Sequence, residues 1–212
     1  CPFGAISDKS QMFQLARALT EGEEIIAEIA PAFVGQFGPN ITPRNIKAAL
    51  GELGFSEVYE VALGADIGAV AEAHHYVEKV VTGELPFLLT SCCPSWAVMA
   101  KKFFPDVIDE ISQELTPMVA TARTIKKEHP DAKVVFIGPC ASKKLEASRR
   151  SVRSDVDFVV TFEEMQAMFD AKGIDLSRYE AESSFHDATG AGRAYGCPGG
   201  VTEAIEKCIN EY

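Results

Sequence analysis

The stretch Val134-Val135-Phe136-Ile137-Gly138-Pro139-Cys140-Ala141-Ser142-Lys143-Lys144 joins a predicted buried strand to the start of a helix. Its first four residues are β-branched or aromatic and apolar, which is typical of a strand covered on both faces. A glycine and a proline end this run, and a cysteine follows them. In open α/β sheets, ligands gather at the carboxyl ends of the strands. The stretch therefore predicts an α/β protein with functional residues just beyond its strands.

Similar apolar runs recur along the chain and alternate with helical patterns. The predicted strands cover residues 25–30, 58–63, 86–89, 134–137 and 158–160. This alternation predicts a mostly parallel sheet with flanking helices. The 212 residues can form one large domain, and no internal repeat or low-complexity segment divides them.

Several helix starts are recognisable in the sequence. Thr42-Pro43 and Thr116-Pro117 each combine an N-cap residue with a proline in the first turn. Thr161 and Glu164 have the spacing of a capping box. Asp66 is expected to cap a further, long helix.

A second cysteine-bearing loop follows the predicted strand 86–89. It reads Thr90-Ser91-Cys92-Cys93-Pro94-Ser95-Trp96 and places two adjacent thiols where a helix is predicted to begin. Backbone N–H groups at a helix N-terminus favour a thiolate over a thiol. A single free cysteine is commonly a small buried hydrophobic residue. The adjacent pair, the proline in each loop and the lysines beyond Cys140 favour metal-ligand or nucleophile chemistry instead.

Composition excludes several kinds of partner and environment. The formal net charge of −11 argues against a surface for nucleic acid or anionic membrane. No apolar run approaches the roughly 20 residues that span a bilayer, and no secretory signal is recognised, so a soluble cytoplasmic protein is expected. Six cysteines in such a chain are predicted to be reduced thiols or metal ligands rather than disulfides.

The two cysteine segments resemble signature motifs of the [FeFe]-hydrogenase catalytic (H-cluster) domain, which read TSCCPxW and PCxxKK. The similarity spans nearly the whole chain and includes residues 112–123 and the glycine-rich stretch 190–200. Gly138 stands where the best-studied enzymes commonly have Met, so the chain is more similar to multi-subunit and sensory-type members. The resemblance implies a partial iron-only hydrogenase fold and a parent protein that reversibly reduces protons to hydrogen.

The resemblance also implies an H-cluster, in which a [4Fe-4S] cubane is joined through a cysteine sulfur to a two-iron subsite with CO, cyanide and a bridging dithiolate. Cys93 and Cys140 match ligands of the cubane. Cys92 matches the thiol that passes protons to the two-iron subsite. Lys143 matches the lysine that donates a hydrogen bond to a cyanide ligand. Soft thiolates, a free thiol and an ammonium suit these respective roles.

Further site residues follow from the same comparison. Ser91 and Pro139 are expected to line the cofactor pocket. Ser112 and Glu72 match a proton relay to solvent, although Glu72 also fits an ordinary solvated helix carboxylate. The family tends to place a second relay carboxylate where this chain has His75. His74 and His75 stay unassigned.

The two ends of the chain lead to separate expectations. Cys1-Pro2 resembles the last turn of a ferredoxin-type cluster domain, so residues 1–8 are interpreted as the remnant of a ferredoxin-like [4Fe-4S] domain and residues 9–212 as the N-terminal part of the H-cluster domain. The third cysteine motif, which completes the cubane, is expected in a missing C-terminal part. Cys197 and Cys208 are interpreted as incidental and packing thiols. The fragment is therefore expected to be inactive alone, and its cluster can be absent.

Three functions stay open at this point. The parent is a hydrogen-metabolising enzyme, a non-catalytic cluster-binding relative such as an assembly protein, or a hydrogen or redox sensor. Cys92 and Lys143 favour the enzyme, because they serve the two-iron subsite, while Gly138 keeps the sensor hypothesis open. A ferredoxin or another electron carrier is the expected partner.

Overall fold

The computed structural model describes residues 3, 8–185 and 188–211. Within them, four parallel strands form one sheet in the order β2-β1-β3-β4. The strands are β1 (Ile25–Ile29), β2 (Glu57–Glu60), β3 (Lys133–Gly138) and β4 (Phe158–Thr161). All residues of β1 are buried, as expected for a central strand covered on both faces. The predicted parallel α/β fold with flanking helices is confirmed.

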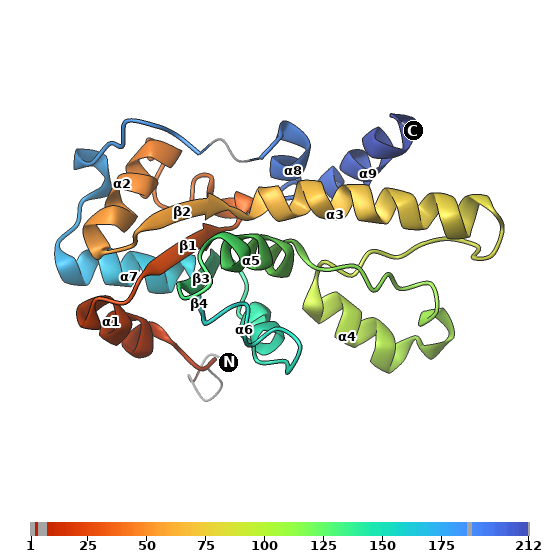
Figure 1. Cartoon of the computed structure of the whole chain (residues 1–212), viewed down its shortest axis with the longest axis horizontal. Helices are drawn as coiled ribbons and strands as arrows, with labels where there is room; N and C mark the ends of the chain where they lie inside the picture. Colours follow the sequence, from red (N-terminus) through yellow and green to blue (C-terminus); the bar gives the residue numbers. More distant parts are fainter. Residues whose placement is uncertain (1–2, 4–7, 186–187, 212) are drawn as a thin grey trace.

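Helices flank this sheet and extend well beyond it on one side (Figure 1). They are α1 (Met12–Glu21), α2 (Pro43–Leu53), α3 (Val61–Tyr76), α4 (Pro94–Phe103), α5 (Pro117–Glu128), α6 (Ser142–Ala147), α7 (Phe162–Lys172), α8 (Gly190–Ala194) and α9 (Gly200–Asn210). Helix α5 packs on β1 and β3, and α7 packs on β3 and β4. In the described part of the chain, no helix is both long and apolar enough to cross a membrane.

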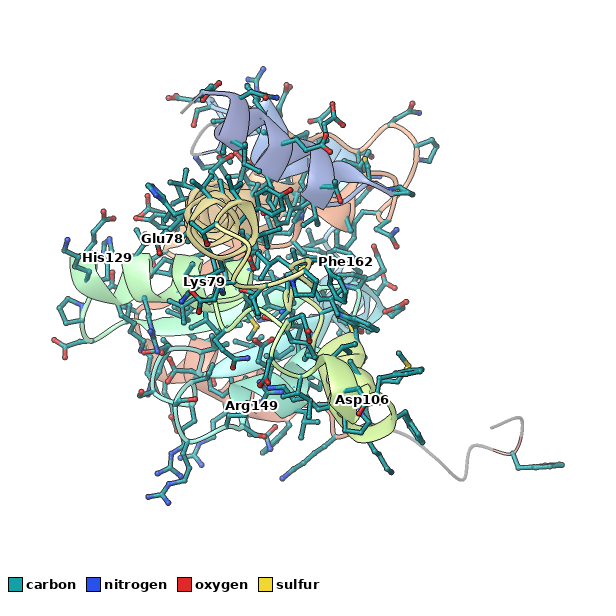
Figure 2. The ribbon with its side chains drawn as sticks, turned by 90° about the vertical axis from the view of Figure 1, so that its right-hand side faces the viewer. Glu78, Lys79, Asp106, His129, Arg149 and Phe162 are labelled. Atoms are coloured by element: carbon teal, nitrogen blue, oxygen red, sulfur yellow. The ribbon has the colours of Figure 1, made fainter. Side chains whose placement is uncertain are left out.

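Helix α3 organises the region outside the sheet. It contacts α5, α8 and α9, and Figure 2 views it nearly end-on, with α9 above it and Asp106, just after α4, below it. Gly64 permits the close approach of α5: a Cβ at this position would clash with the carbonyl oxygen of Pro117. The Gly64 amide donates to Thr121 Oγ1 at 3.0 Å. Helix α3 therefore fixes the first turns of α5 at a set distance.

The predicted capping box of Thr161 and Glu164 and the predicted N-cap residue Thr42 are confirmed, and Thr42 also forms a capping box with Asn45. The Thr42 hydroxyl oxygen accepts from the Asn45 amide at the start of α2, and the Thr161 hydroxyl oxygen accepts from the Glu164 amide at the start of α7. Thr116 is the N-cap residue of α5, but its side chain makes no capping hydrogen bond.

Thr161→Ala is expected to lower the free energy of unfolding by about 1 kcal/mol, because the Glu164 amide loses its acceptor. Thr161→Ser keeps that oxygen and serves as the control. Urea unfolding of both variants measures the difference. An equal loss in the two variants would assign the effect to the missing methyl group rather than to the cap.

One predicted strand and one predicted helix start were wrong. Residues 86–89 do not form a strand of the sheet; Leu89 makes an isolated parallel bridge with Ile111. Pro86 has no amide donor, and the side chain of Phe87 is 43% exposed, so this apolar run is not a core strand. The first cysteine motif thus follows an isolated β-bridge rather than a strand of the sheet.

The second difference concerns the start of α3. The predicted strand 58–63 ends at Glu60, and α3 begins at the next residue without a connecting loop. Asp66 consequently lies inside the helix, where its carboxylate accepts hydrogen bonds from the Thr189 amide at 2.7 Å and hydroxyl at 2.6 Å. It holds the segment before α8 instead of capping α3.

Candidate active site

The two cysteine loops meet at a cavity of about 280 Å³. The cavity lies at the carboxyl ends of β1 and β3, where Ala30 and Pro139 border it. Among the residues predicted from the sequence, it is lined by Cys92, Cys93, Pro139, Cys140 and Lys143. The fold thus brings together residues that are up to 51 positions apart in the sequence.

The two predicted cubane ligands lie next to helix starts. Cys93 is the N-cap residue of α4, and its Sγ accepts from the Trp96 amide at 3.5 Å. Cys140 Sγ lies 2.8 Å from Ser142 Oγ, at the start of α6. Cys93 is exposed and Cys140 is half-buried. Both sulfurs are therefore accessible and lie where backbone amides can stabilise a thiolate.

A buried ion pair holds Lys143. Its Nζ donates to Glu146 Oε2 at 2.7 Å and to the backbone carbonyl oxygen of Cys92 at 3.3 Å. Glu146 Oε1 in turn accepts from the Thr116 hydroxyl at 2.8 Å. An ammonium group has three donors, and these contacts use two of them. Since Lys143 lines the cavity, its third donor can serve an anionic group bound there.

Cys92 differs from Cys93 in its surroundings. Burial raises the pKa of the Cys92 thiol, and the ammonium of Lys143 offsets part of that rise. The charges of Cys93 and Glu72 raise the pKa further. Cys92 therefore keeps its proton at neutral pH, which suits a thiol that carries a proton rather than one that binds iron.

Glu72 and Ser112 lie close together, as the predicted relay requires. Glu72 on α3 is only 7% exposed, so the alternative of a solvated helix carboxylate was wrong. Burial raises the pKa of Glu72 to about 7; a hydrogen bond from the Ser112 side chain lowers it, and the charge of Glu114 raises it. A small cavity of about 10 Å³ is lined by both Glu72 and Cys92. This is the space of one water molecule.

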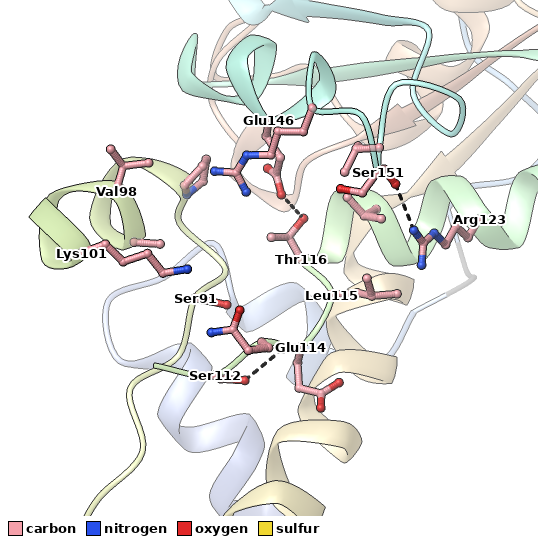
Figure 3. Close-up of a pocket in the computed structure, with 16 residues that line it drawn as sticks. Ser91, Val98, Lys101, Ser112, Glu114, Leu115, Thr116, Arg123, Glu146 and Ser151 are labelled. Atoms are coloured by element: carbon pink, nitrogen blue, oxygen red, sulfur yellow. Dashed lines mark hydrogen bonds between the residues drawn. The ribbon is translucent and has the colours of Figure 1, made fainter. Parts of the chain in front are cut away.

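Ser91 lies elsewhere than expected. It faces a second cavity of about 290 Å³, which Ser112, Thr116 and Glu146 also line (Figure 3). Pro139 lines the first cavity, as stated above, so the two residues expected in one pocket border different ones. Pro94 lines both cavities.

The remaining cysteines do not complete a metal site. In the described residues, no group of three or more His, Cys, Asp or Glu side chains is placed to hold a metal ion. Cys208 packs beside Ala204 and Ile205, as predicted, and Cys197 is exposed. Cys1 and most of the interpreted ferredoxin remnant lie outside the described residues. Cys93 and Cys140 thus fit half of the ligand set that a cubane needs.

Sequence reasoning missed three contributors to this region. Glu146 is the buried partner of Lys143, and the i,i+3 spacing of opposite charges could have indicated it. Tyr195 lines the first cavity from the glycine-rich stretch, and no sequence signal pointed to it. Phe136 also lines this cavity, and its ring occupies the place that a Cβ at position 138 would need. Gly138 therefore lets an aromatic ring form part of the wall.

Comparison with known proteins gives a consistent result. The family model described as the iron-only hydrogenase large subunit, C-terminal domain, matches residues 23–212. Iron hydrogenase 1 of Clostridium pasteurianum is 31% identical over an alignment of 236 positions, which covers 100% of this chain and 41% of that protein. A cytosolic Fe-S cluster assembly factor of Kluyveromyces lactis is 35% identical over 105 residues, covering 50% of this chain and 22% of that protein.

Solved structures resemble the fold closely. An apo [FeFe]-hydrogenase of Chlamydomonas reinhardtii superposes with a TM-score of 0.76 at 28% identity, covering 95% of this chain and 58% of that one. The chain thus spans less than two thirds of the length of both of these hydrogenases.

Proposed function

Since the chain belongs to the iron-only hydrogenase large-subunit family, we propose that it forms part of a hydrogen-activating domain whose parent protein reversibly converts protons and electrons to hydrogen. The observation that carries this proposal is the convergence of Cys92, Cys93, Cys140 and Lys143 on one cavity. Cys93 and Cys140 would hold the cubane, with the remaining ligands supplied by a further part of the protein. The H-cluster, when bound, supplies the iron at which protons and electrons combine.

The chain's own residues provide a route for the proton. Cys92 faces the cavity and holds its proton at neutral pH. Glu72, whose pKa burial raises to about 7, can take up and release a proton near neutral pH. The cavity of about 10 Å³ between them has room for one bridging water. Ser112 connects Glu72 towards the second cavity.

Lys143 has the role of orienting an anionic part of the cofactor. Its contacts with Glu146 and with the carbonyl of Cys92 fix the ammonium at the cavity wall. A charge-assisted hydrogen bond from this group to a cyanide ligand would be stronger than one between neutral groups.

A cluster-binding protein without hydrogenase activity is the second candidate. The similarity to an Fe-S cluster assembly factor over half of the chain favours it. A cluster carrier has no need of a proton-holding thiol, a buried carboxyl near neutral pKa and a fixed ammonium around one site. The presence of Cys92, Glu72 and Lys143 in this arrangement favours the enzyme. A sensor with the same active-site chemistry would be distinguished from the enzyme by a signalling domain encoded in the full gene.

Cys92→Ala is expected to lower hydrogen evolution by at least about 10²-fold, because the active site loses its nearest proton donor. The test uses the gene product extended to its natural ends and matured anaerobically with the two-iron subsite. Cys208→Ala removes a thiol away from the cavity and serves as the matched control. A fully loaded wild-type protein without hydrogen evolution would favour the carrier or sensor.

Partners and location are part of the same proposal. Electrons must reach the cubane, so a ferredoxin or a similar carrier is the proposed partner. The five described cysteines are all free thiols, which suits a reducing, cytoplasmic environment.

A further inference from the structure

Tyr195 borders both spaces through which the proposed proton route runs. It lines the cavity of about 280 Å³ and also the small cavity of about 10 Å³. Cys92 is likewise common to both, and Glu72 lines only the small one. The tyrosine thus lies beside the gap between the thiol and the carboxyl group.

The position of Tyr195 is fixed by its neighbours along the chain. Arg193 forms a two-pronged ion pair with Glu60, with N–O distances of 2.7 and 2.6 Å. Gly192 packs so closely on α3 that a Cβ there would clash with the carbonyl oxygen of Ala62. The ring of Tyr195 packs against the apolar cluster of α3 and α9 around Ala69 and Ala204. These contacts tie the tyrosine to the helix that carries Glu72.

The hydroxyl group of Tyr195 interacts electrostatically with two groups of the proposed proton route, Cys92 and Glu72. Burial raises its pKa, and the charges of Cys92 and then Glu72 raise it further. The hydroxyl therefore stays protonated and can donate a hydrogen bond. Glu72 interacts electrostatically with Ser112, Glu114, Cys92 and Tyr195.

We propose that Tyr195 is a positioning residue of the proton route, whose hydroxyl hydrogen-bonds the water that fills the small cavity and so aligns Glu72 with Cys92. Tyr195 keeps its own proton throughout. The role in proton transfer rests on the proposed function, whereas the hydrogen bond of Tyr195 is expected in the chain without its cofactor as well.

The first test is made on the metal-free chain with Tyr195→Phe, which removes the hydroxyl and keeps the ring. Infrared difference spectroscopy follows the carbonyl band of protonated Glu72, which is assigned by its loss in Glu72→Gln, because Glu28 contributes a second protonated carboxyl. The midpoint pH of this band is expected to rise by about 0.5–1 unit, since the water that donates to the ionised carboxylate loses the hydroxyl that holds it in place. Tyr179→Phe, at a half-buried tyrosine that packs against the main core, is the matched control and should leave the band unchanged.

The second test uses the extended, matured protein. Tyr195→Phe is expected to slow hydrogen evolution several-fold and to increase the solvent isotope effect, with cluster loading unchanged. Identical Glu72 spectra in Tyr195→Phe and wild type would overturn the inference even if the enzyme is active. A shifted Glu72 band in a protein that evolves no hydrogen would support the contact and overturn the proposed function instead.

Discussion

Glu146→Ala is expected to lower the free energy of unfolding by about 3–5 kcal/mol, because it leaves the Lys143 ammonium buried without its partner. The side chains of Lys143 and Glu146 are only 12% and 3% exposed, and their N–O distance is 2.7 Å. Thr116 loses an acceptor in the same substitution. Urea unfolding at neutral pH measures the loss.

Matched variants separate the buried pair from an ordinary surface pair. Arg17 and Glu21 form an exposed pair at the same 2.7 Å, with side chains 68% and 48% exposed. Glu21→Ala should cost less than about 1 kcal/mol, because solvent screens such a pair. Replacing both Lys143 and Glu146 by Met should cost less than Glu146→Ala, because no unpaired charge remains. Equal losses for Glu146→Ala and Glu21→Ala would show that water reaches Lys143.

Glu28→Met is expected to raise the free energy of unfolding at pH 7.5 by about 1–3 kcal/mol, because it removes a buried polar group without a partner. Glu28 lies in β1 and is 0% exposed. Neither of its carboxyl oxygens has a hydrogen-bond partner within the described part of the chain. Burial raises its pKa well above the ordinary value of 4.5; the Lys143 charge lowers it and the Glu146 charge raises it.

The pH dependence of this effect has a defined sign. The folded-state pKa of Glu28 is higher than the unfolded-state pKa, so its protonated form favours folding fully only below about pH 4.5. As the pH rises, the unfolded chain ionises while the folded chain resists ionisation, and the wild type loses stability. The advantage of Glu28→Met should therefore grow from pH 4 to pH 8. Glu28→Gln never ionises either, so its stability relative to wild type should change with pH in the same way, and its difference from Glu28→Met should stay constant. A constant difference between Glu28→Met and wild type from pH 4 to pH 8 would mean that Glu28 titrates normally in the fold.

The sequence predicted those elements whose local signals agree with their tertiary setting. Strand β3 is apolar from Val134 to Ile137, and β1 is apolar apart from Glu28, as expected for strands whose two faces are covered by helices. The capping boxes of α2 and α7 depend on residues three positions apart, so no distant contact can override them. The two cysteine motifs were recognised as one site because their residue types and spacing are specific.

The rest depends on contacts that the sequence order does not reveal. Residues 86–89 are apolar, but in the fold they lie outside the four-stranded sheet and Leu89 pairs with Ile111 instead. Glu28 interrupts an apolar run as a buried carboxyl, and a sequence pattern cannot distinguish it from a solvent-facing residue. Glu72 shares its small cavity with Thr90, Leu115 and Tyr195, which come from three distant parts of the chain. The burial and the contacts of such residues can be determined only from the tertiary structure.

The close approach at Gly64 also limits which insertions and deletions α3 can accept during evolution. Gly64 fits against α5, and Glu72 stands eight positions further along the same helix. One residue added or removed between them would rotate Glu72 by about 100° around the helix axis and shift it by about 1.5 Å, which would turn its carboxyl group away from Cys92. Length changes are therefore expected to be confined to loops, while the spacing from Gly64 to Glu72 is preserved even where the residues between them vary.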